Sequence, residues 1–328
     1  MPIGTGQVRF EEVAVPDAPA YNKVIVFADV GDKKAKTKNN DGTTTTLLRD
    51  GWDRNFVING GFTFAQRQTP GTLTNFTATA DRSFNAVTVL VGPDRWGVTS
   101  QVNNLQYQRI DAITNDEPGL SARYYGKFKQ SGSASKCMIS QVIEASDCAC
   151  LRGKIVRLQA RMRWSLAPSG MRIRAGIVNN TGTADVPTNP WTVSWGTSPY
   201  NGMDPVLGAS LQYIPPSTVK NGIGIDGQGA TFELSDRWQV YSATFLIPTT
   251  AKNIIPVFWT DAQMAVADEL NITEVGLYVG EEARQWVEMP YALERMQCQR
   301  FYCKTFNTDI LPQAALATST GGIRSLTM

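Results

Sequence analysis

Residues 155–166 alternate between apolar and polar side chains, and this alternation constrains the fold more than any other feature of the chain. Apolar residues from Val156 to Leu166 occupy every second position, with mainly arginine and glutamine residues between them. Successive side chains of a β-strand point to opposite faces, so the pattern predicts a strand with one buried face and one solvent-exposed face. Similar patterns predict strands at 171–177, 239–247 and 275–279.

The segments between these predicted strands contain turn-forming residues and no amphipathic helical pattern. Several short strands in succession without helices indicate an all-β fold, an antiparallel β-sandwich of the jelly-roll type. Hydrophobic residues make up 42 % of the 328 residues, enough for a substantial core. We expect this sandwich to span residues 51–288.

Residues 1–50 differ from the predicted sandwich. After a proline-interrupted start, a strand is predicted at 23–28, and a second at 43–48 follows the turn sequence Asn40-Asp41-Gly42. Asn and Gly accept the positive φ angles of tight hairpin turns. A lone hairpin is marginally stable in water, so it needs a neighbouring subunit or a larger assembly. We therefore predict an N-terminal arm and hairpin that attach the chain to other proteins.

Residues 289–328 form the third predicted part, a helical hinge followed by a tail. Pro290 opens a short helix in which Leu293, Met296 and Arg300 fall on one side at helical spacing. We expect this side of the helix to dock on the sandwich or on a partner subunit.

The composition argues against several classes of function. The chain has no histidine, which removes Ser-His-Asp and Cys-His catalysis and most zinc hydrolase sites. A net charge of +2 argues against nucleic acid as the main partner. No apolar run approaches the ~18 residues of a membrane span, so no membrane insertion is expected. We expect no cofactor and no metal.

The five cysteines are odd in number and too few for a disulfide framework. Cys148 and Cys150 are two positions apart, and Cys298 and Cys303 are five apart, so neither pair has the spacing of a Cys-x-x-Cys metal knuckle. We expect free, mostly buried thiols with a structural role, which fits synthesis in a reducing cytoplasm.

A row of arginines on the predicted strand at 155–166 is one candidate binding surface. Arg157, Arg161 and Arg163 share one face of this strand. If the next predicted strand is its neighbour in the sheet, Arg172 and Arg174 lie beside this row. Such a row suits an anionic ligand such as an acidic polysaccharide. The alternatives are a solvated outer sheet face and pairing between subunits.

The region 180–230 is rich in Gly, Pro, Asn and Thr and is predicted to form long loops with embedded strands. Long loops on a rigid sandwich commonly carry function. Trp191, Trp195 and Tyr200 are therefore candidates for a sugar-stacking platform, because an aromatic face matches the C–H face of a pyranose. The alternative is that these rings pack the loop onto the sandwich.

Three carboxylates, Asp226, Glu233 and Asp236, are candidates for an acid/base pair. A glycosidase needs two carboxyl groups at a defined separation. Exposed turn positions explain these residues equally well.

Four stretches of the chain carry a resemblance to a known family. The first is a proline-rich start followed by Lys23-Val-Ile-Val-Phe27 and by residues 36–47, and the second is Asn55-Phe-Val-Ile-Asn-Gly-Gly-Phe62. The third is Gln141-Val-Ile-Glu144 followed by residues 151–158. The fourth is Pro290-Tyr291 together with Cys298-Gln-Arg-Phe-Tyr302. In this order they resemble the attachment segment, sandwich start, central strands and exit hinge of a recurrent module of bacteriophage fibre and tail proteins.

The chain also departs from this family. A tryptophan usually stands near the position of Phe64-Ala65, and a Tyr-Tyr pair is here Phe301-Tyr302. A further β domain usually follows the hinge. We therefore expect residues 304–328 to differ most from the relatives, with neighbouring subunits as a possible source of C-terminal strands.

The resemblance implies a non-enzymatic virion protein, assembled in the host cytoplasm. It implies a homo-oligomer, expected to be a trimer, that binds other virion proteins through residues 1–50. The carbohydrate-binding-module-like sandwich would form a fibre or knob that attaches to a host-surface glycan. Two alternatives stay open: a head fibre, capsid decoration or baseplate component without a receptor, and a polysaccharide depolymerase.

Overall fold

The computed structural model describes residues 12–13, 17, 25–29, 35–38, 44–46, 54–65, 74–76, 93–100, 105–115, 117, 119–164, 171–185, 191–195, 205–207, 210–225 and 228–300. The chain divides into two compact units, Met1–Arg54 and Asn55–Met328. Each unit is a separate body and is taken by itself below. The predicted division into 1–50, 51–288 and 289–328 stays a prediction.

The first unit contains a small sheet with the strand order β1-β2-β3-β4 among its described residues. The strands are β1 (Glu12–Val13), β2 (Ile25–Asp29), β3 (Ala35–Lys38) and β4 (Thr44–Thr46). β1 pairs with β2 in parallel, and the other pairs are antiparallel. The chain reverses between Lys38 and Thr44, the interval that contains the predicted turn. Sequence reasoning missed β1 and β3, which widen the predicted hairpin into a sheet.

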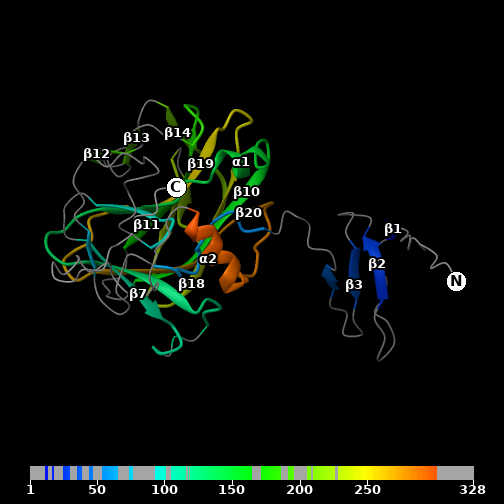
Figure 1. Ribbon diagram of the computed structural model, residues 1–328, viewed down its shortest axis with the longest axis horizontal. Helices are drawn as coiled ribbons and strands as arrows, with labels where there is room; N and C mark the ends of the chain where they lie inside the picture. Colours follow the sequence, from blue (N-terminus) through cyan, green and yellow to red (C-terminus); the bar gives the residue numbers. More distant parts are fainter. Residues whose placement is uncertain are drawn as a thin grey trace, which may run out of the picture. The chain divides into compact units, whose positions relative to one another are not determined.

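The second unit is an antiparallel β-sandwich, as predicted (Figure 1). The strands of the first sheet are, in order, β15 (Pro216–Lys220), β18 (Gln239–Leu246), β10 (Ile155–Trp164), β20 (Glu269–Val279), β8 (Tyr124–Gln130), β7 (Leu105–Asp111) and β5 (Thr74–Phe76). Those of the second sheet are β16 (Gly224–Ile225), β17 (Ala230–Glu233), β11 (Arg172–Asn180), β19 (Asn253–Thr260), β9 (Cys137–Ser140) and β6 (Gly97–Ser100), with β14 (Leu211–Ile214) also paired to β11. β12 (Trp191–Trp195) and β13 (Pro205–Leu207) form a separate pair.

The core lies between the two sheets and follows the alternation seen in the sequence. On β10 the apolar residues Val156, Leu158 and Met162 are buried, and on β11 Ile173 and Ile177 are buried. All five belong to one continuous apolar cluster. Burying a side chain of this size contributes about 1.5–3 kcal/mol, so the alternating positions hold the two sheets together.

The opposite face of β10 is only partly exposed to solvent, so the prediction of one fully solvent-exposed face was wrong. Arg157 and Gln159 are 3 % and 4 % exposed. Arg157 Nη1 donates to the backbone oxygen of Glu281, and Gln159 Nε2 donates to that of Arg284 at 2.8 Å. The segment that follows β20 therefore covers half of this face, because its carbonyl groups offer partners to long polar side chains.

The second sheet carries an additional apolar layer on its outer face. Every residue of β19 is buried. The outward-facing side chains on this sheet form a second cluster of Met138, Val178, Leu211, Ile255, Val257 and Trp259. Leu207 of β13 and Tyr213 of β14 pack against this cluster. Part of the loop region 180–230 thus covers the sandwich.

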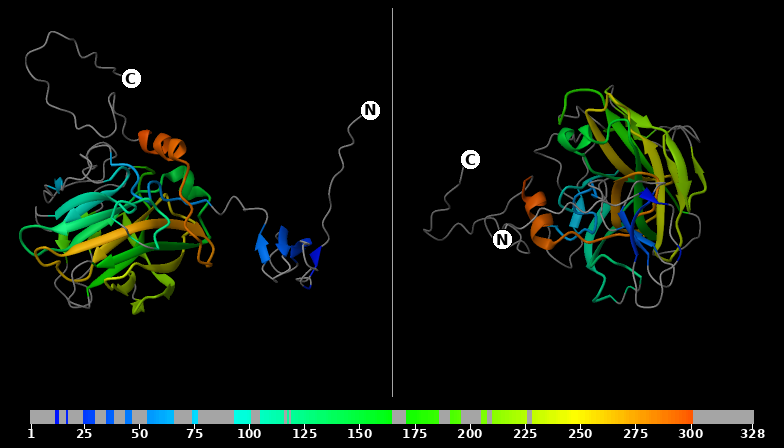
Figure 2. Two further views of the ribbon diagram at one scale, coloured as in Figure 1. Left: turned by 90° about the horizontal axis from the view of Figure 1, so that it is seen from below. Right: turned by 90° about the vertical axis from the view of Figure 1, so that its right-hand side faces the viewer.

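Within the described part of the second unit, the helices α1 (Ala145–Ala149) and α2 (Tyr291–Gln299) flank the sheets. Pro290 stands at the N-cap of α2, as predicted, and Figure 2 shows α2, coloured orange, outside the two sheets. Docking of the predicted side on the sandwich was wrong, because Leu293 and Met296 are 54 % and 63 % exposed. Docking of that side on a partner subunit stays a prediction. Glu294 and Cys298, one turn apart, are buried instead.

Candidate functional site

Three of the stretches that carried the resemblance meet in one place, which we call the junction: residues 55–65, 141–144 and 290–300. The amide group of Gln141 joins the first two stretches. Its Oε1 accepts from the backbone N–H of Ile58, and its Nε2 donates to the oxygen of Ile58, both at 2.8 Å. This side chain mimics a strand partner and satisfies both polar groups of a buried residue.

Asn59 organises the turn at the start of the junction. Its Nδ2 donates to the backbone oxygens of Phe64 and Asp94, each at 2.8 Å, and its Oδ1 accepts from the N–H of Phe64 at 2.9 Å. Trp96 Nε1 donates to the backbone oxygen of Asn59 at 3.0 Å. The side chain is fully buried and its φ is 58°, a value that asparagine tolerates better than most residues.

Helix α2 closes the junction from outside. The rings of Phe64 and Tyr291 have centroids 4.8 Å apart, and Cys298 packs with Ile58 and Phe64. Because the junction is filled by its own side chains and backbone groups, it is a structural feature that ties the start of the sandwich to its end.

The arginine row occupies the outer face of the first sheet. Arg161 Nε forms an ion pair with Glu274 Oε2 at 2.9 Å. Oε1 of Glu274 accepts from the backbone N–H groups of Ser121 and Ala122. Glu274 stands where the pairing register between β10 and β20 shifts, and its φ is 52°. A bulge in β20 therefore aims this carboxylate at Arg161.

Arg163 belongs to a tighter group that we call the Glu117 cluster: Glu117, Tyr125, Arg163 and Trp238. Arg163 Nη2 pairs with Glu117 Oε1. Glu117 also accepts from Trp238 Nε1 at 3.1 Å and from the Tyr125 hydroxyl at 3.4 Å. The guanidinium of Arg163 lies 4.8 Å from the centroid of the Trp238 ring. Burial, then the charge of Glu117, raises the pKa of Tyr125 to about 12.

All three arginines of the predicted row thus have partners within the chain. Arg161 and Arg163 have carboxylates, and Arg157 donates to a backbone oxygen and to Ser242 Oγ. An anionic ligand would have to compete with these partners. Binding of such a ligand by Arg157, Arg161 and Arg163 stays a prediction.

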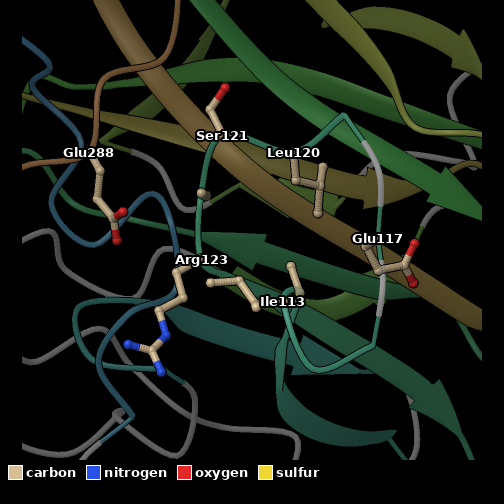
Figure 3. A pocket seen from close by; sticks show the side chains of 8 residues that line it. Ile113, Glu117, Leu120, Ser121, Arg123 and Glu288 are labelled. Atoms are coloured by element: carbon tan, nitrogen blue, oxygen red, sulfur yellow. The ribbon is translucent and has the colours of Figure 1, made fainter.

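A pocket of about 470 Å³ opens beside the Glu117 cluster (Figure 3). It is formed by the loop between β7 and β8 and by the segment before α2, and its lining consists of Ala112, Ile113, Glu117, Leu120, Ser121, Ala122, Arg123 and Glu288. Ligand pockets typically measure ~300–1,000 Å³, so this space suits a small molecule. Figure 3 shows Glu117 and Glu288 at opposite ends of the pocket, with Arg123 and Ile113 between them.

The pocket combines polar and apolar groups. Arg123 donates through Nε and Nη2 to Asp111 Oδ2, each at 3.2 Å. Burial raises the pKa of Glu288, whereas the charge of Arg123 and the hydroxyl of Thr63 lower it. No described residue forms an ion pair with Glu288. Ile113 is 73 % exposed. The arrangement offers hydrogen-bond partners beside apolar surface, the combination that a sugar requires.

The predicted aromatic platform lies mostly outside the described residues. The backbone register pairs Trp191 with Leu207 and Trp195 with Pro205. The side chains of both tryptophans, and the whole of Tyr200, lie outside the description. Their role in stacking on a sugar stays a prediction.

The candidate carboxylates are not brought together by any described contact. Glu233 ends β17 and Asp236 lies in the turn that follows, both with exposed side chains, and Asp226 lies outside the described residues. No described group of three or more His, Cys, Asp or Glu residues could hold a metal ion. No helix within the described residues is long and apolar enough to cross a membrane.

The described cysteines are free, as predicted. Cys137, Cys148 and Cys298 are buried and Cys150 is exposed, while Cys303 lies outside the described residues. Burial raises the pKa of Cys148 to about 11 and that of Cys137 to about 12. The buried thiols are therefore protonated and unreactive near neutral pH.

Sequence reasoning missed the pocket and the Glu117 cluster. The loop at 111–120 reads Asp-Ala-Ile-Thr-Asn-Asp-Glu-Pro-Gly-Leu, in which Ile113 stands alone among turn-forming residues. Surface loops commonly carry function, but a single exposed apolar residue is ordinary on a protein surface. The sequence therefore carries no specific signal for Ile113, Tyr125, Trp238 or Glu288.

No family model matches the chain, and no curated protein matches it. Among solved structures, it is similar to the module TmCBM61 in complex with beta-1,4-galactotriose, with 12 % identity, 70 % of this chain and 99 % of that chain covered, and a TM-score of 0.36. It is also similar to the CBM22-1-GH10 modules of Clostridium thermocellum xylanase 10B complexed with xylohexaose, with 11 % identity, 63 % and 29 % covered, and a TM-score of 0.34.

A third similar structure is the enzymatically active domain of Bacteriophage CBA120 tailspike protein 4, with 9 % identity and a TM-score of 0.34. That match covers 61 % of this chain and 22 % of the tailspike chain. With TM-scores below 0.5, none of these similarities supports a functional assignment. The fold and the site define an antiparallel β-sandwich protein with a small separate N-terminal sheet and an open pocket on one loop.

Proposed function

We propose that this chain is a non-enzymatic bacteriophage virion protein that attaches to a glycan on the host surface. The observation that carries the binding part is the open pocket between the β7–β8 loop and Glu288. The virion part is supported by the order of the four sequence stretches. It is also supported by the N-terminal unit, which has a four-stranded sheet of its own among its described residues and would serve as the attachment segment.

The pocket matches the chemistry of a sugar. Hydroxyl groups of a sugar would donate to the Glu288 carboxylate and exchange hydrogen bonds with the Ser121 hydroxyl, while Arg123 would donate to ring or hydroxyl oxygens. The C–H faces would lie against Ile113 and Leu120. Each hydrogen bond contributes about 0.5–1.5 kcal/mol net, so a single site binds weakly. A trimer, as predicted, would multiply such weak contacts by valency.

The direct test is a glycan array followed by titration of the best glycan. The variants Ile113→Ser and Glu288→Gln should weaken binding at least about tenfold, since each loses ~1.4 kcal/mol or more. Ile223→Ser is the matched control, because Ile223 is also exposed, at 51 %, and lies outside the pocket. If both pocket variants bind the glycan with unchanged affinity, the pocket is not the glycan site.

The same array examines the aromatic residues predicted from the sequence. If Trp191→Ala or Trp195→Ala abolishes binding while the pocket variants retain it, the glycan site lies on the β12–β13 pair. Absence of glycan binding, release of reducing ends from host polysaccharide, or a monodisperse monomer with and without residues 1–50 would each contradict the proposed function.

A second candidate is a structural virion component without a receptor. It is favoured by the exposed apolar side chains of Val287, Leu293 and Met296, each more than half exposed. Such residues suit a contact within a larger assembly. Particles that lose integrity without the protein, but adsorb normally to host cells when they are intact, would support this candidate over the first.

A further inference from the structure

Glu294 is an acidic side chain on the buried side of α2. It is 3 % exposed, and Cys298, one helical turn later on the same side, is 1 % exposed. Leu293 and Met296 point the other way and are more than half exposed. The helix therefore docks with a carboxyl group beneath it, where a surface helix ordinarily buries an apolar residue.

The carboxyl group of Glu294 is poorly compensated in this place. Its Oε2 atom is buried without a hydrogen-bond partner among the described residues, and so is Oγ1 of Thr63. Burial raises the pKa of Glu294 from 4.5 to about 7, although Thr63 and the backbone of Asn59 act in the opposite direction. A buried carboxyl with one unpartnered oxygen favours its neutral form, and burial is the largest influence on Glu294.

The surrounding charges do not stabilise an ionised Glu294. Glu288, from the segment before α2, has the same sign and raises the pKa of Glu294 further. No described cation forms an ion pair with Glu294. The other titratable or charged groups here are Tyr291, Arg295 and Cys298 on α2, Arg300 at its C-cap, Asp94 and Arg95 before β6, Arg109 on β7, and Glu144 before α1.

Helix α2 can open without the rest of the sandwich. It is nine residues long, and helices of this length are marginal in water without tertiary contacts. Its described contacts include the Phe64–Tyr291 ring pair, the packing of Cys298, and an ion pair between Glu144 and the C-cap residue Arg300 at 2.9 Å, whose arginine is 59 % exposed. Local opening of such a segment costs far less than global unfolding.

We propose that α2 is a pH-controlled latch on the junction: it stays docked while the Glu294 carboxyl holds a proton, and its docking weakens when that carboxyl ionises. In water the opened helix can solvate the carboxylate, whereas the docked helix cannot. The latch acts where the chain leaves the sandwich. This inference does not depend on glycan binding.

The direction of the effect follows from the two pKa values. The docked pKa of about 7 lies above the ordinary value of 4.5, so the stabilisation is complete below pH 4.5 and is lost as pH rises towards 7. Above that pH both forms are ionised and the loss no longer grows. Opening should therefore become about twentyfold more frequent between pH 5.5 and 7.5.

Cys298 reports this opening directly, because its thiol is covered when α2 is docked. Wild-type protein and Glu294→Gln are treated with N-ethylmaleimide at pH 5.5, 6.5 and 7.5, and labelling is followed by mass spectrometry. Trypsin releases Met296–Arg300, which contains Cys298 and no other cysteine. The ratio of wild-type to variant labelling rates should rise about twentyfold across this range, since the variant cancels the pH dependence of the thiol itself.

Cys137 and Cys148 are buried elsewhere in the sandwich and serve as internal controls. Their labelling should show no such pH-dependent ratio. The inference is overturned if wild type and Glu294→Gln have the same pH profile, or if all three thiols respond together, which would indicate global opening. If the variant does not fold, hydrogen exchange of 291–299 relative to β10 in the wild type decides: unchanged relative protection between pH 5.5 and 7.5 overturns the latch.

Discussion

The junction and the pocket are only a few residues apart along the segment that leads into α2, yet they are built differently. Glu288 lines the pocket, and Glu294 is buried at the junction. At the junction Asn59 and Phe62 are fully buried, and the side-chain amide of Asn59 is bonded to the backbone. At the pocket Ile113 is 73 % exposed.

The sequence resemblance therefore marks the junction, which is a packing feature, and does not mark the pocket, which is the proposed ligand site. The recognisable stretches at 55–62, 141–144 and 290–300 build the junction, where close packing leaves little freedom for substitution. The pocket is made by a loop that no motif marks, and such loops tolerate change while they carry binding. The residues of the junction can therefore stay the same while the pocket loop changes its ligand.

The largest expected effect comes from a glycine at the junction. A Cβ at Gly60 would lie 2.1 Å from the backbone oxygen of Val275 and 2.9 Å from the Trp286 ring, so Gly60→Ala must displace β20. We expect a loss of about 3 kcal/mol or more in the free energy of unfolding, measured by chemical denaturation.

The matched change in the pocket loop is Gly119→Ala. A Cβ there has Arg161 Nη1 as its nearest neighbour, at 4.0 Å, but the φ of Gly119 is +83°. The cost should be about 1–2 kcal/mol, from backbone strain alone. Equal losses for the two glycines would break the distinction between junction and pocket.

The next effect compares two asparagines. Asn59→Ala removes three hydrogen bonds to backbone groups and leaves buried donors and acceptors unpaired. It should cost about 2–4 kcal/mol in the free energy of unfolding. Asn115→Ala removes an exposed bond to the backbone oxygen of Asp111 and should cost less than about 0.5 kcal/mol. A small loss for Asn59→Ala would show that the turn does not need its side chain.

Sequence reasoning found β10 from its alternation and missed β19. The alternation in β10 is visible because one face meets the core and the other does not. β19 reads Asn-Ile-Ile-Pro-Val-Phe-Trp-Thr and shows no such alternation, since a second apolar cluster covers its outer face. Only the tertiary fold creates that cluster.

Helix α2 and the arginines of β10 also depend on tertiary contacts that the sequence pattern does not reveal. Pro290 predicts where α2 begins, but hydrophobicity does not identify the side that packs within this chain, because a buried position on that side holds Glu294. The arginines on β10 were identified as a shared face, but their carboxylate partners lie 113 and 46 residues away in sequence. Pairing over such separations depends on the strand order, which spacing alone does not contain.

The smallest expected effect lies in the ion pairs near the pocket. Arg163 and Glu117 have side chains that are 19 % and 13 % exposed, and Trp238 lies beside them. A double-mutant cycle with Arg163→Gln and Glu117→Gln should give a coupling of about 1 kcal/mol, because partial burial reduces screening. The measurement is chemical denaturation at low and high salt.

The control cycle uses Arg123 and Asp111, whose arginine is 56 % exposed. We expect no measurable coupling for that pair, since water and salt screen it. If the two cycles give the same coupling energy, the Glu117 cluster is no more rigid than the surrounding surface. A clear difference would mean that one wall of the pocket is held in place before any ligand arrives, which lowers the ordering cost of binding.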